Sequence, residues 1–203
     1  MILPIIAVIA CYLLGSVSFS VVLAKGLKGI DIRQHGSGNA GATNTLRVLG
    51  KGPAIMVLAL DVMKGIAAVW IGRWLGGGSE WIAALSGIAA IIGHNWPLYF
   101  RFRGGKGIAT TIGVMATLVF FPALYAGIIA ILSIVFTRYV SLGSLIFVFL
   151  TPIFLLLSGE FGAYFWASLV ICLFAFWRHR TNIVKIAQGK ENKLGSKGGT
   201  RIV

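Results

Sequence analysis

Residues 36–44 form a glycine-rich polar segment whose residue types are suited to binding an anion. The segment reads Gly36-Ser37-Gly38-Asn39-Ala40-Gly41-Ala42-Thr43-Asn44, and it is flanked by Arg33, His35, Arg47 and Lys51. Glycines allow backbone N–H groups to turn toward a ligand and allow the ligand to approach closely. Hydroxyls and amides add directed hydrogen bonds, and the flanking cations attract negative charge. Because apolar stretches lie on both sides, we expect a phosphorylated substrate to meet this loop at a membrane surface.

A second glycine-rich segment carries a lysine. It reads Arg101-Phe102-Arg103-Gly104-Gly105-Lys106-Gly107 and leads into an apolar run that predicts a helix from near Ile108. Free N–H groups and the helix dipole both favour an anion at a helix N-terminus, so this position of Lys106 predicts an anion site. Two further polar clusters, residues 141–144 and 178–182, stand at the start and the end of later apolar runs.

Each polar cluster also has a purely structural interpretation. Basic residues at helix ends commonly anchor a helix at the membrane surface, and we favour that role for Arg101, Arg103, Arg138 and Arg178. Taken alone, Ser144 is best explained as a helix N-cap, and His179 is compatible with a simple interfacial position. The two glycine-rich segments resist such explanations, because a plain connection needs neither so many glycines nor so many hydroxyls and amides.

Three titratable residues fall inside or at the end of apolar runs. Asp61 and Lys64 are spaced to share one helix face, and His94 ends a later run. Ionisable residues within a membrane are usually functional, but an acid and a base at this spacing can also neutralise each other. A structural pair and a role in the site therefore both remain open for Asp61 and Lys64. We expect His94 to support the site from behind it.

The composition is that of a membrane protein. The chain is 58% hydrophobic and 11% charged, and its mean hydropathy is +0.91. In such a chain the net charge of +13 favours an anionic lipid surface and anionic substrates over nucleic acid. Cys11 and Cys172 lie in apolar runs, which indicates small buried residues and neither a disulfide nor a metal site. The N-terminus lacks a charged leader and a cleavage site, so we expect a retained first helix.

The apolar runs predict an all-α, polytopic bundle of about seven membrane-spanning helices in a single domain covering 1–203. The run at 108–137 is too long for one span and contains Pro122, so we expect two helices that meet near Phe121 and Pro122. The other expected spans are 2–24, 53–75, 81–99, 144–158 and 161–177. We expect a poorly ordered basic tail at about 185–203.

Charge orients these spans. Nearly all Lys and Arg residues fall in alternate connections and in the tail, whereas the intervening connections hold only Arg73. The positive-inside rule then places the C-terminus and the polar clusters on the cytoplasmic side, with the N-terminus outside.

Missing motifs exclude several enzyme classes. Acyltransferases with a His-x4-Asp dyad are excluded, because Ala40, Tyr99 and Val184 occupy the aspartate position after the three histidines. The five acidic residues form no Asp-rich metal motif, and no Walker A sequence is present. We therefore expect neither a metal nor a cofactor.

These motifs resemble those of a known family. Residues 36–44 followed by Arg47 resemble the first signature of the bacterial acyl-phosphate glycerol-3-phosphate acyltransferases, the PlsY family. Residues 93–107 resemble the second signature, and residues 141–144 together with 178–182 resemble the third. The resemblance covers essentially the whole chain, with the motifs in the same order.

The resemblance implies an enzyme of the bacterial inner membrane that performs the first acylation of phospholipid synthesis. It would transfer a fatty acyl group from acyl phosphate to the 1-hydroxyl of glycerol 3-phosphate, giving lysophosphatidic acid and inorganic phosphate by direct attack, without an acyl-enzyme. The implied catalytic residues are Ser37, Lys106, Ser144 and His179. The implied substrate-binding residues are Gly38, Asn39, Gly41, Thr43, Asn44, Arg47, Gly104, Gly105 and Asn182. The general base stays open between His179 and a substrate phosphate.

The same loops are compatible with two other functions. An organophosphate or anion transporter could use the loops as a cytoplasmic gate, but the sequence has no inverted repeat. A scaffold protein could bind anionic lipid heads without any turnover. The expected partners are the two substrates and the lipid bilayer, with transient contact to an enzyme that forms acyl phosphate.

Overall fold

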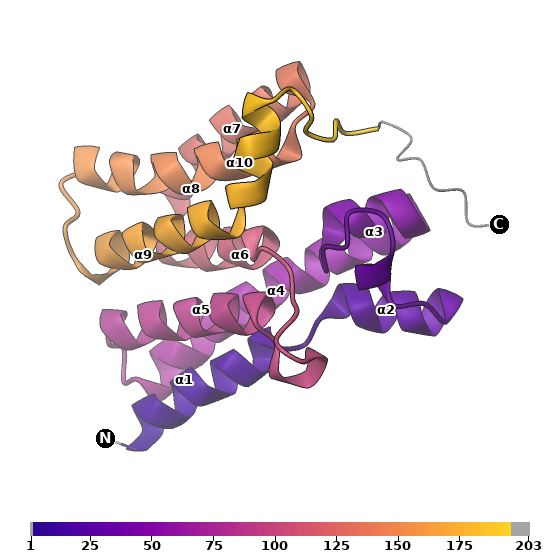
Figure 1. The fold of residues 1–203 in the computed structure, drawn as a ribbon. Coiled ribbons are helices and arrows are strands. Elements are labelled where there is room, and N and C mark those ends of the chain that lie inside the picture. The colour runs from indigo at the N-terminus through magenta and orange to yellow at the C-terminus, as the bar shows by residue number, and fades with distance from the viewer. Residues whose placement is uncertain (1, 196–203) are drawn as a thin grey trace.

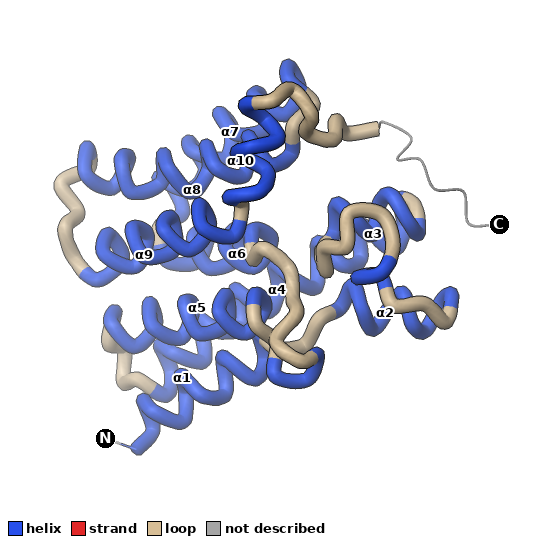
Figure 2. The backbone as a smooth tube through the Cα atoms, viewed as in Figure 1, coloured by secondary structure: helices blue, strands red, loops and turns tan. Residues whose placement is uncertain are grey.

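The computed structural model describes residues 2–195, and this part of the chain is helical without any strand (Figure 1, Figure 2). The α-helices are α1 Ile2–Gly15, α2 Phe19–Lys28, α3 Ala42–Leu49, α4 Lys51–Leu75, α5 Glu80–Asn95, α6 Ile108–Leu118, α7 Phe120–Thr137, α8 Val140–Leu157, α9 Ala163–Arg178 and α10 Arg180–Ala187. Short 3-10 turns, η1 Ile32–Gln34 and η2 Leu98–Phe100, precede the two glycine-rich loops. Residues 196–203 of the expected tail lie outside the described residues.

The first expected span is broken. The expectation of one helix over 2–24 was wrong, because α1 ends at Gly15 and α2 begins at Phe19. Gly15 packs directly on α5, where an added Cβ would overlap the backbone of Ala90. Lys64 of α4 stabilises the break, because its Nζ donates to the carbonyl oxygens of Gly15 (3.2 Å) and Val17 (3.0 Å). A buried cation therefore satisfies carbonyls that the interrupted helix leaves open.

The division of 108–137 into two helices is confirmed. The break falls at Val119, slightly before the expected position, and Val119 has a non-helical φ of −144°. Pro122 lies in the first turn of α7, where a missing N–H breaks no intrahelical hydrogen bond.

Two other helix boundaries differ from the expectation by four residues, and two short helices were not expected. Helix α8 begins at Val140, so Ser144 lies within the first turns and its hydroxyl donates to the Val140 carbonyl at 2.8 Å. Helix α5 ends at Asn95 and not at 99, because the chain turns away at Pro97. The short polar helices α3 and α10 were not predicted, because they lack the long apolar runs by which the spans were identified.

The polar segments gather at one end of the bundle. Figure 1 shows α2, α3, the start of α6 and α10 at that end, with the N-terminus at the opposite end. Helices α1 and α5 lie on one side of the bundle and α7, α8 and α9 on the other, with α4 packed against α1, α5 and α6. The segments predicted to share one face of the membrane therefore do lie together.

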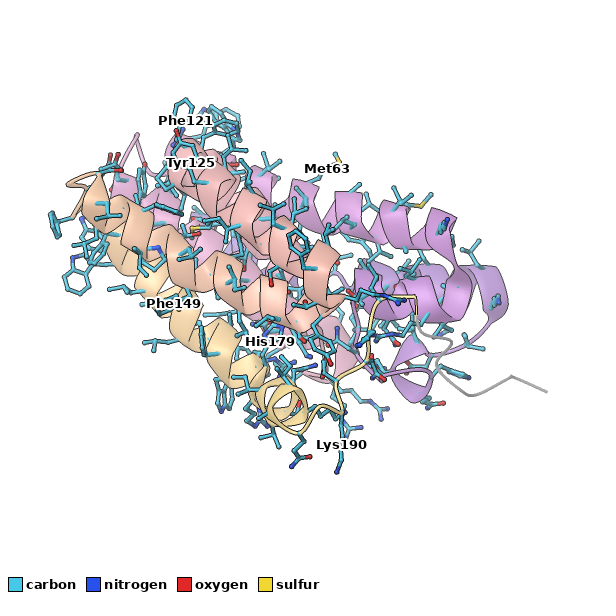
Figure 3. All side chains as sticks on the ribbon, turned by 90° about the horizontal axis from the view of Figure 1, so that it is seen from above. Met63, Phe121, Tyr125, Phe149, His179 and Lys190 are labelled. Carbon is cyan, nitrogen blue, oxygen red and sulfur yellow. The ribbon has the colours of Figure 1, made fainter. Side chains whose placement is uncertain are left out.

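Within the described residues, four helical segments are long and apolar enough to cross a membrane: Ile2–Lys28, Lys51–Leu75, Phe120–Thr137 and Val140–Leu157. Ile108–Leu118 and Ala163–Arg178 are shorter apolar helices. Phe121 and Tyr125 are exposed, and Figure 3 shows them together at the end of the bundle away from His179 and Lys190. Aromatic side chains at a bundle end are typical of a membrane interface. The fold is an integral-membrane helical bundle, and the number of crossings stays a prediction.

Close packing of α4 on α6 depends on Gly65, because an added Cβ there would overlap the carbonyl oxygen of Thr110. We predict that Gly65→Leu lowers the thermal unfolding midpoint in detergent, with an overpacking cost of about 1–3 kcal/mol or more. Gly52→Leu is the matched control, because nothing lies within 4 Å of an added Cβ at that position of the same helix. Equal midpoints for the two variants would contradict the packing argument.

Candidate active site

One large cavity of about 940 Å³ joins the polar end of the bundle to an apolar groove. The polar part is lined by the two glycine-rich loops and by the facing ends of α8, α9 and α10. The apolar part runs between α4, α6 and α7 and is lined by Ile55, Leu58, Ile112, Ala116, Phe120, Leu124, Ile128, Ile131 and Ile134. The cavity can therefore hold a molecule with an anionic head and a long apolar tail.

The side chain of Asn44 fixes the conformation of the loop at 36–44 by hydrogen bonds to its backbone. The Asn44 Oδ1 accepts from the Ser37 backbone N–H at 2.8 Å, and its Nδ2 donates to the carbonyls of Ile32 (3.1 Å) and His35 (3.0 Å). Gly38 has a positive φ of 72°, a conformation that L-residues with side chains rarely adopt. Asn44 thus supports the loop from within. Asn44 lines the cavity together with six other residues of this loop: Ser37, Gly38, Asn39, Gly41, Ala42 and Thr43.

The basic residues around this loop have different roles. Arg47 on α3 and Lys51 on α4 line the cavity. Arg33 instead pairs with Asp31 at 2.7 Å and donates to the Phe100 carbonyl at 2.8 Å. The Arg33 guanidinium bonded to Asp31 lowers the pKa of that carboxyl. Arg33 therefore fastens the first loop to the segment that leads into the second.

The glycine–lysine loop can enter the site because Gly104 and Gly105 have no side chains. A Cβ at Gly104 would overlap the His94 carbonyl oxygen, and the Gly105 N–H donates to that oxygen at 3.1 Å. Gly104, Lys106 and Gly107 line the cavity, whereas Gly105 lies behind its surface. Gly107 is the N-cap of α6, with a φ of 81°.

Lys106 reaches across the cavity mouth and donates from Nζ to the Asn182 side-chain oxygen. Burial lowers the pKa of Lys106 to about 8, and Glu191 acts in the opposite direction. The ammonium is therefore mostly charged at neutral pH and close to titration.

Arg178 does more than anchor a helix end at the membrane surface. Its Nη2 donates to the Gly105 carbonyl at 2.5 Å, and its guanidinium lies 5.2 Å from the centroid of the Trp96 ring. The stacked cation joins α9 to the glycine–lysine loop. This arrangement fixes Lys106 relative to His179, the residue that follows Arg178.

His179 lies where α9 gives way to α10 (Figure 3). Its Nδ1 lies 2.8 Å from the Ala175 carbonyl, which can only accept, so Nδ1 carries the proton. Burial, reinforced by the charge of Lys106, lowers the pKa of His179 to about 4. The imidazole is therefore neutral, and its Nε2 makes no hydrogen bond to any of the described residues; His179 lines the cavity.

Glu191 is the residue that sequence reasoning missed. Its Oε1 accepts from Ser141 Oγ at 2.9 Å and from Asn182 Nδ2 at 2.7 Å. It therefore orients the Asn182 amide so that the oxygen of that amide faces Lys106. The only signal was one acidic residue within an otherwise basic tail, and that tail was expected to be poorly ordered.

Except for Gly105, every residue expected to bind or react lines the same cavity. Asp61 and His94 line it too, so these two buried residues belong to its wall. Between residues 2 and 195, no group of three or more His, Cys, Asp or Glu side chains could hold a metal ion. The chemistry available is anion binding by cations, backbone amides and hydroxyls beside an apolar groove.

The chain is similar to known glycerol-3-phosphate acyltransferases. The model of the family described as glycerol-3-phosphate acyltransferase matches residues 5–189. The glycerol-3-phosphate acyltransferase of Halalkalibacterium halodurans is 60% identical over 198 residues, which cover 95% of this chain and 96% of the relative. That of Shouchella clausii is 60% identical over 191 residues, which cover 92% of this chain and 93% of the relative.

Two solved structures have the same fold. The crystal structure of PlsY (YgiH), an integral membrane glycerol 3-phosphate acyltransferase, in its glycerol 3-phosphate form matches with a TM-score of 0.89 and 37% identity, over 95% of this chain and 96% of that one. The lysophosphatidic acid form matches with a TM-score of 0.86 and 36% identity, over 96% of this chain and 97% of that one. The chain belongs to the glycerol-3-phosphate acyltransferase family.

Proposed function

We propose that this protein transfers a fatty acyl group from acyl phosphate to the 1-hydroxyl of glycerol 3-phosphate. The observation that carries the proposal is the single cavity in which two anion-binding loops adjoin one apolar groove. Two phosphorylated substrates need many donors and cations but few acids, and the polar wall has that composition. An acyl phosphate is already activated, so the reaction needs no cofactor and no covalent enzyme intermediate.

Different residues of the polar wall bind each of the two substrates. Lys106, Arg47, His179 and Asn182 bind glycerol 3-phosphate, the first two by charge and the others by hydrogen bonds. The backbone amides of the loop at 36–44 hold the phosphate of the acyl donor, with Gly38, Asn39, Gly41 and Thr43 in contact with it and Asn44 bracing them. Gly104 lets the glycerol phosphate approach the backbone, and Gly105 supports the loop from behind. Ser37 and Ser144 orient the reacting groups.

The acyl group is transferred directly from the donor to the acceptor. The oxygen of the 1-hydroxyl attacks the acyl carbonyl carbon, the new ester bond forms, and the bond from that carbon to the phosphate oxygen breaks. The hydroxyl proton passes to a phosphate oxygen, so the products are lysophosphatidic acid and inorganic phosphate. We favour a substrate phosphate as the base because the low pKa of His179, about 4, makes that imidazole a weak proton acceptor. His179 Nε2 then serves as an acceptor that positions the hydroxyl.

The apolar groove holds the acyl chain. Residues of α7 that line it, from Ile134 near the polar wall to Phe120, follow one face of the helix. That face is about 21 Å long at 1.5 Å rise per residue, which suits a palmitoyl-length chain.

We place the polar end at the cytoplasmic face of the bacterial cell membrane, with about seven spans and the N-terminus outside. The gathering of basic segments at this end supports the placement. An enzyme that forms acyl phosphate would then meet the cavity from the cytoplasm.

The proposal predicts turnover by the purified protein in detergent with chelator present. Glycerol 3-phosphate and palmitoyl phosphate should give lysophosphatidic acid and inorganic phosphate in equal amounts. Lys106→Ala should lower kcat/KM by about 100-fold or more, because a charged donor to phosphate is lost. Lys28→Ala, on an exposed position outside the cavity, is the control. Movement of phosphate across proteoliposomes without ester formation would instead indicate a transporter.

The pKa of Lys106, about 8, predicts how substrate binding depends on pH. The charged lysine binds the phosphate dianion, and the ammonium is lost as pH rises through that value. Titration calorimetry of glycerol 3-phosphate should therefore show an affinity that falls about tenfold from pH 7 to pH 9. Lys106→Arg stays charged throughout and should flatten the profile. An equally steep fall in that variant would exclude Lys106 as the titrating group.

We predict that the absence of a side chain at Gly127 allows long acyl chains to fit the groove. Gly127 lines the groove on α7, about 10 Å along the helix from Ile134, and nothing lies within 4 Å of an added Cβ. Gly127→Leu should therefore block the far half of the groove while the helix stays intact. We predict that the kcat/KM ratio of palmitoyl over octanoyl phosphate falls at least about tenfold.

The control for this variant is Val135→Phe, which adds bulk to an exposed position of α7 outside the cavity. It should leave the chain-length ratio unchanged. An unchanged ratio in Gly127→Leu would show that the acyl chain follows another path.

A further inference from the structure

Three buried titratable side chains form a cluster that the proposed reaction does not use. Asp61 and Lys64 of α4 are 1% and 3% exposed, and His94 of α5 is 5% exposed. The Lys64 Nζ lies 2.7 Å from Asp61 Oδ1 and 2.9 Å from His94 Nδ1. It also donates to the carbonyls of Gly15 and Val17 at the α1–α2 break. The cluster therefore joins α1, α4 and α5, and two of its members, Asp61 and His94, form part of the cavity wall.

The contacts of Lys64 determine which nitrogen of His94 carries the proton. An ammonium group has donors only, and the Asp61 carboxylate at 2.7 Å favours the charged form of Lys64. His94 Nδ1 also lies 3.5 Å from Asp61 Oδ1, but the ammonium at 2.9 Å is nearer, so we assign Nδ1 as an acceptor from Lys64. The ring is then neutral with its proton on Nε2, because a proton on Nδ1 would face the ammonium.

The Nε2–H group lies where the two glycine-rich loops meet. A Cβ at Gly105 of the second loop would overlap His94 Nε2 and also the carbonyl oxygen of Ala40 in the first loop. His94 is among the residues that line the cavity. Among the hydrogen bonds of the described residues none involves His94 Nε2, whereas Nδ1 lies 2.9 Å from Lys64 Nζ and 3.5 Å from Asp61 Oδ1. A ring nitrogen without a hydrogen-bonded protein partner thus lies at the junction of the two loops.

We propose that His94 is a further binding residue of the site, whose Nε2–H donates to an oxygen of a bound phosphate at the junction of the two loops. Lys64 and Asp61 are positioning residues that hold the ring in the tautomer able to donate. This inference rests on the proposed function, because only that function identifies the bound phosphate as part of a substrate.

Two substitutions at position 94 distinguish a role of His94 in phosphate binding from a purely structural role. Asparagine can place its oxygen near the position of Nδ1 and keep an acceptor for Lys64, but it loses the donor. Glutamine can place its amide nitrogen near the position of Nε2 and keep the donor. We expect inorganic phosphate to bind about 10- to 100-fold more weakly to His94→Asn and within about threefold of wild type to His94→Gln. Calorimetry with the full chain in detergent measures both, and thermal unfolding midpoints confirm that both variants fold.

Equal phosphate affinity in the two variants would overturn the proposal, because a purely structural histidine would not distinguish them. If neither variant folds, nitrogen-15 NMR of histidine-labelled wild-type protein decides. His94 should then show the Nε2–H tautomer, and phosphate should shift its resonance. The opposite tautomer, or no shift at saturating phosphate, would contradict the inference. Phosphate binding is measured without turnover, so failure here is distinct from failure of the acyl-transfer assay.

Discussion

The site depends on the close approach of backbone that the missing side chains at Gly104 and Gly105 allow. At Gly104 the chain lies against the His94 carbonyl, and at Gly105 it lies against the His94 ring and the Ala40 carbonyl, with no room for a Cβ at either position. This contact brings the two glycine-rich loops together at the end of α5. Arg178 then holds the same loop from α9. Lys106 points into the cavity because the residues before it are fixed on both sides.

Few acidic side chains contact the cations and amides of the site. Asp61 of the cavity wall pairs with Lys64, and Glu191 orients Asn182 at the rim. Among the described residues no acid forms an ion pair with Lys106, and burial lowers the pKa of that lysine to about 8 although the charge of Glu191 acts in the opposite direction. An anionic ligand restores the charge balance that the folded protein leaves incomplete, so binding energy is available for the two phosphorylated substrates that we propose.

The sequence was sufficient to predict the membrane bundle, the break between α6 and α7, and the meeting of four distant polar clusters, because apolar length and basic connections determine these. It could not reveal the α1–α2 break, which depends on the contact of Lys64 with Gly15 and Val17. Arg178 was expected to be an anchor, and Glu191 was assigned to the tail. Both assignments missed contacts between residues far apart in the chain. Asn44 matched the motif, but its bracing role appears only in the folded loop.

The central claim is that both substrates occupy one cavity and react directly, without an acyl-enzyme. Rapid-quench measurement of phosphate release, with the protein in excess over palmitoyl phosphate, tests it most directly. The account predicts no release on mixing with palmitoyl phosphate alone, and prompt release together with lysophosphatidic acid once glycerol 3-phosphate is added. A burst of phosphate in the absence of glycerol 3-phosphate, with the acyl group retained on the protein, would contradict it.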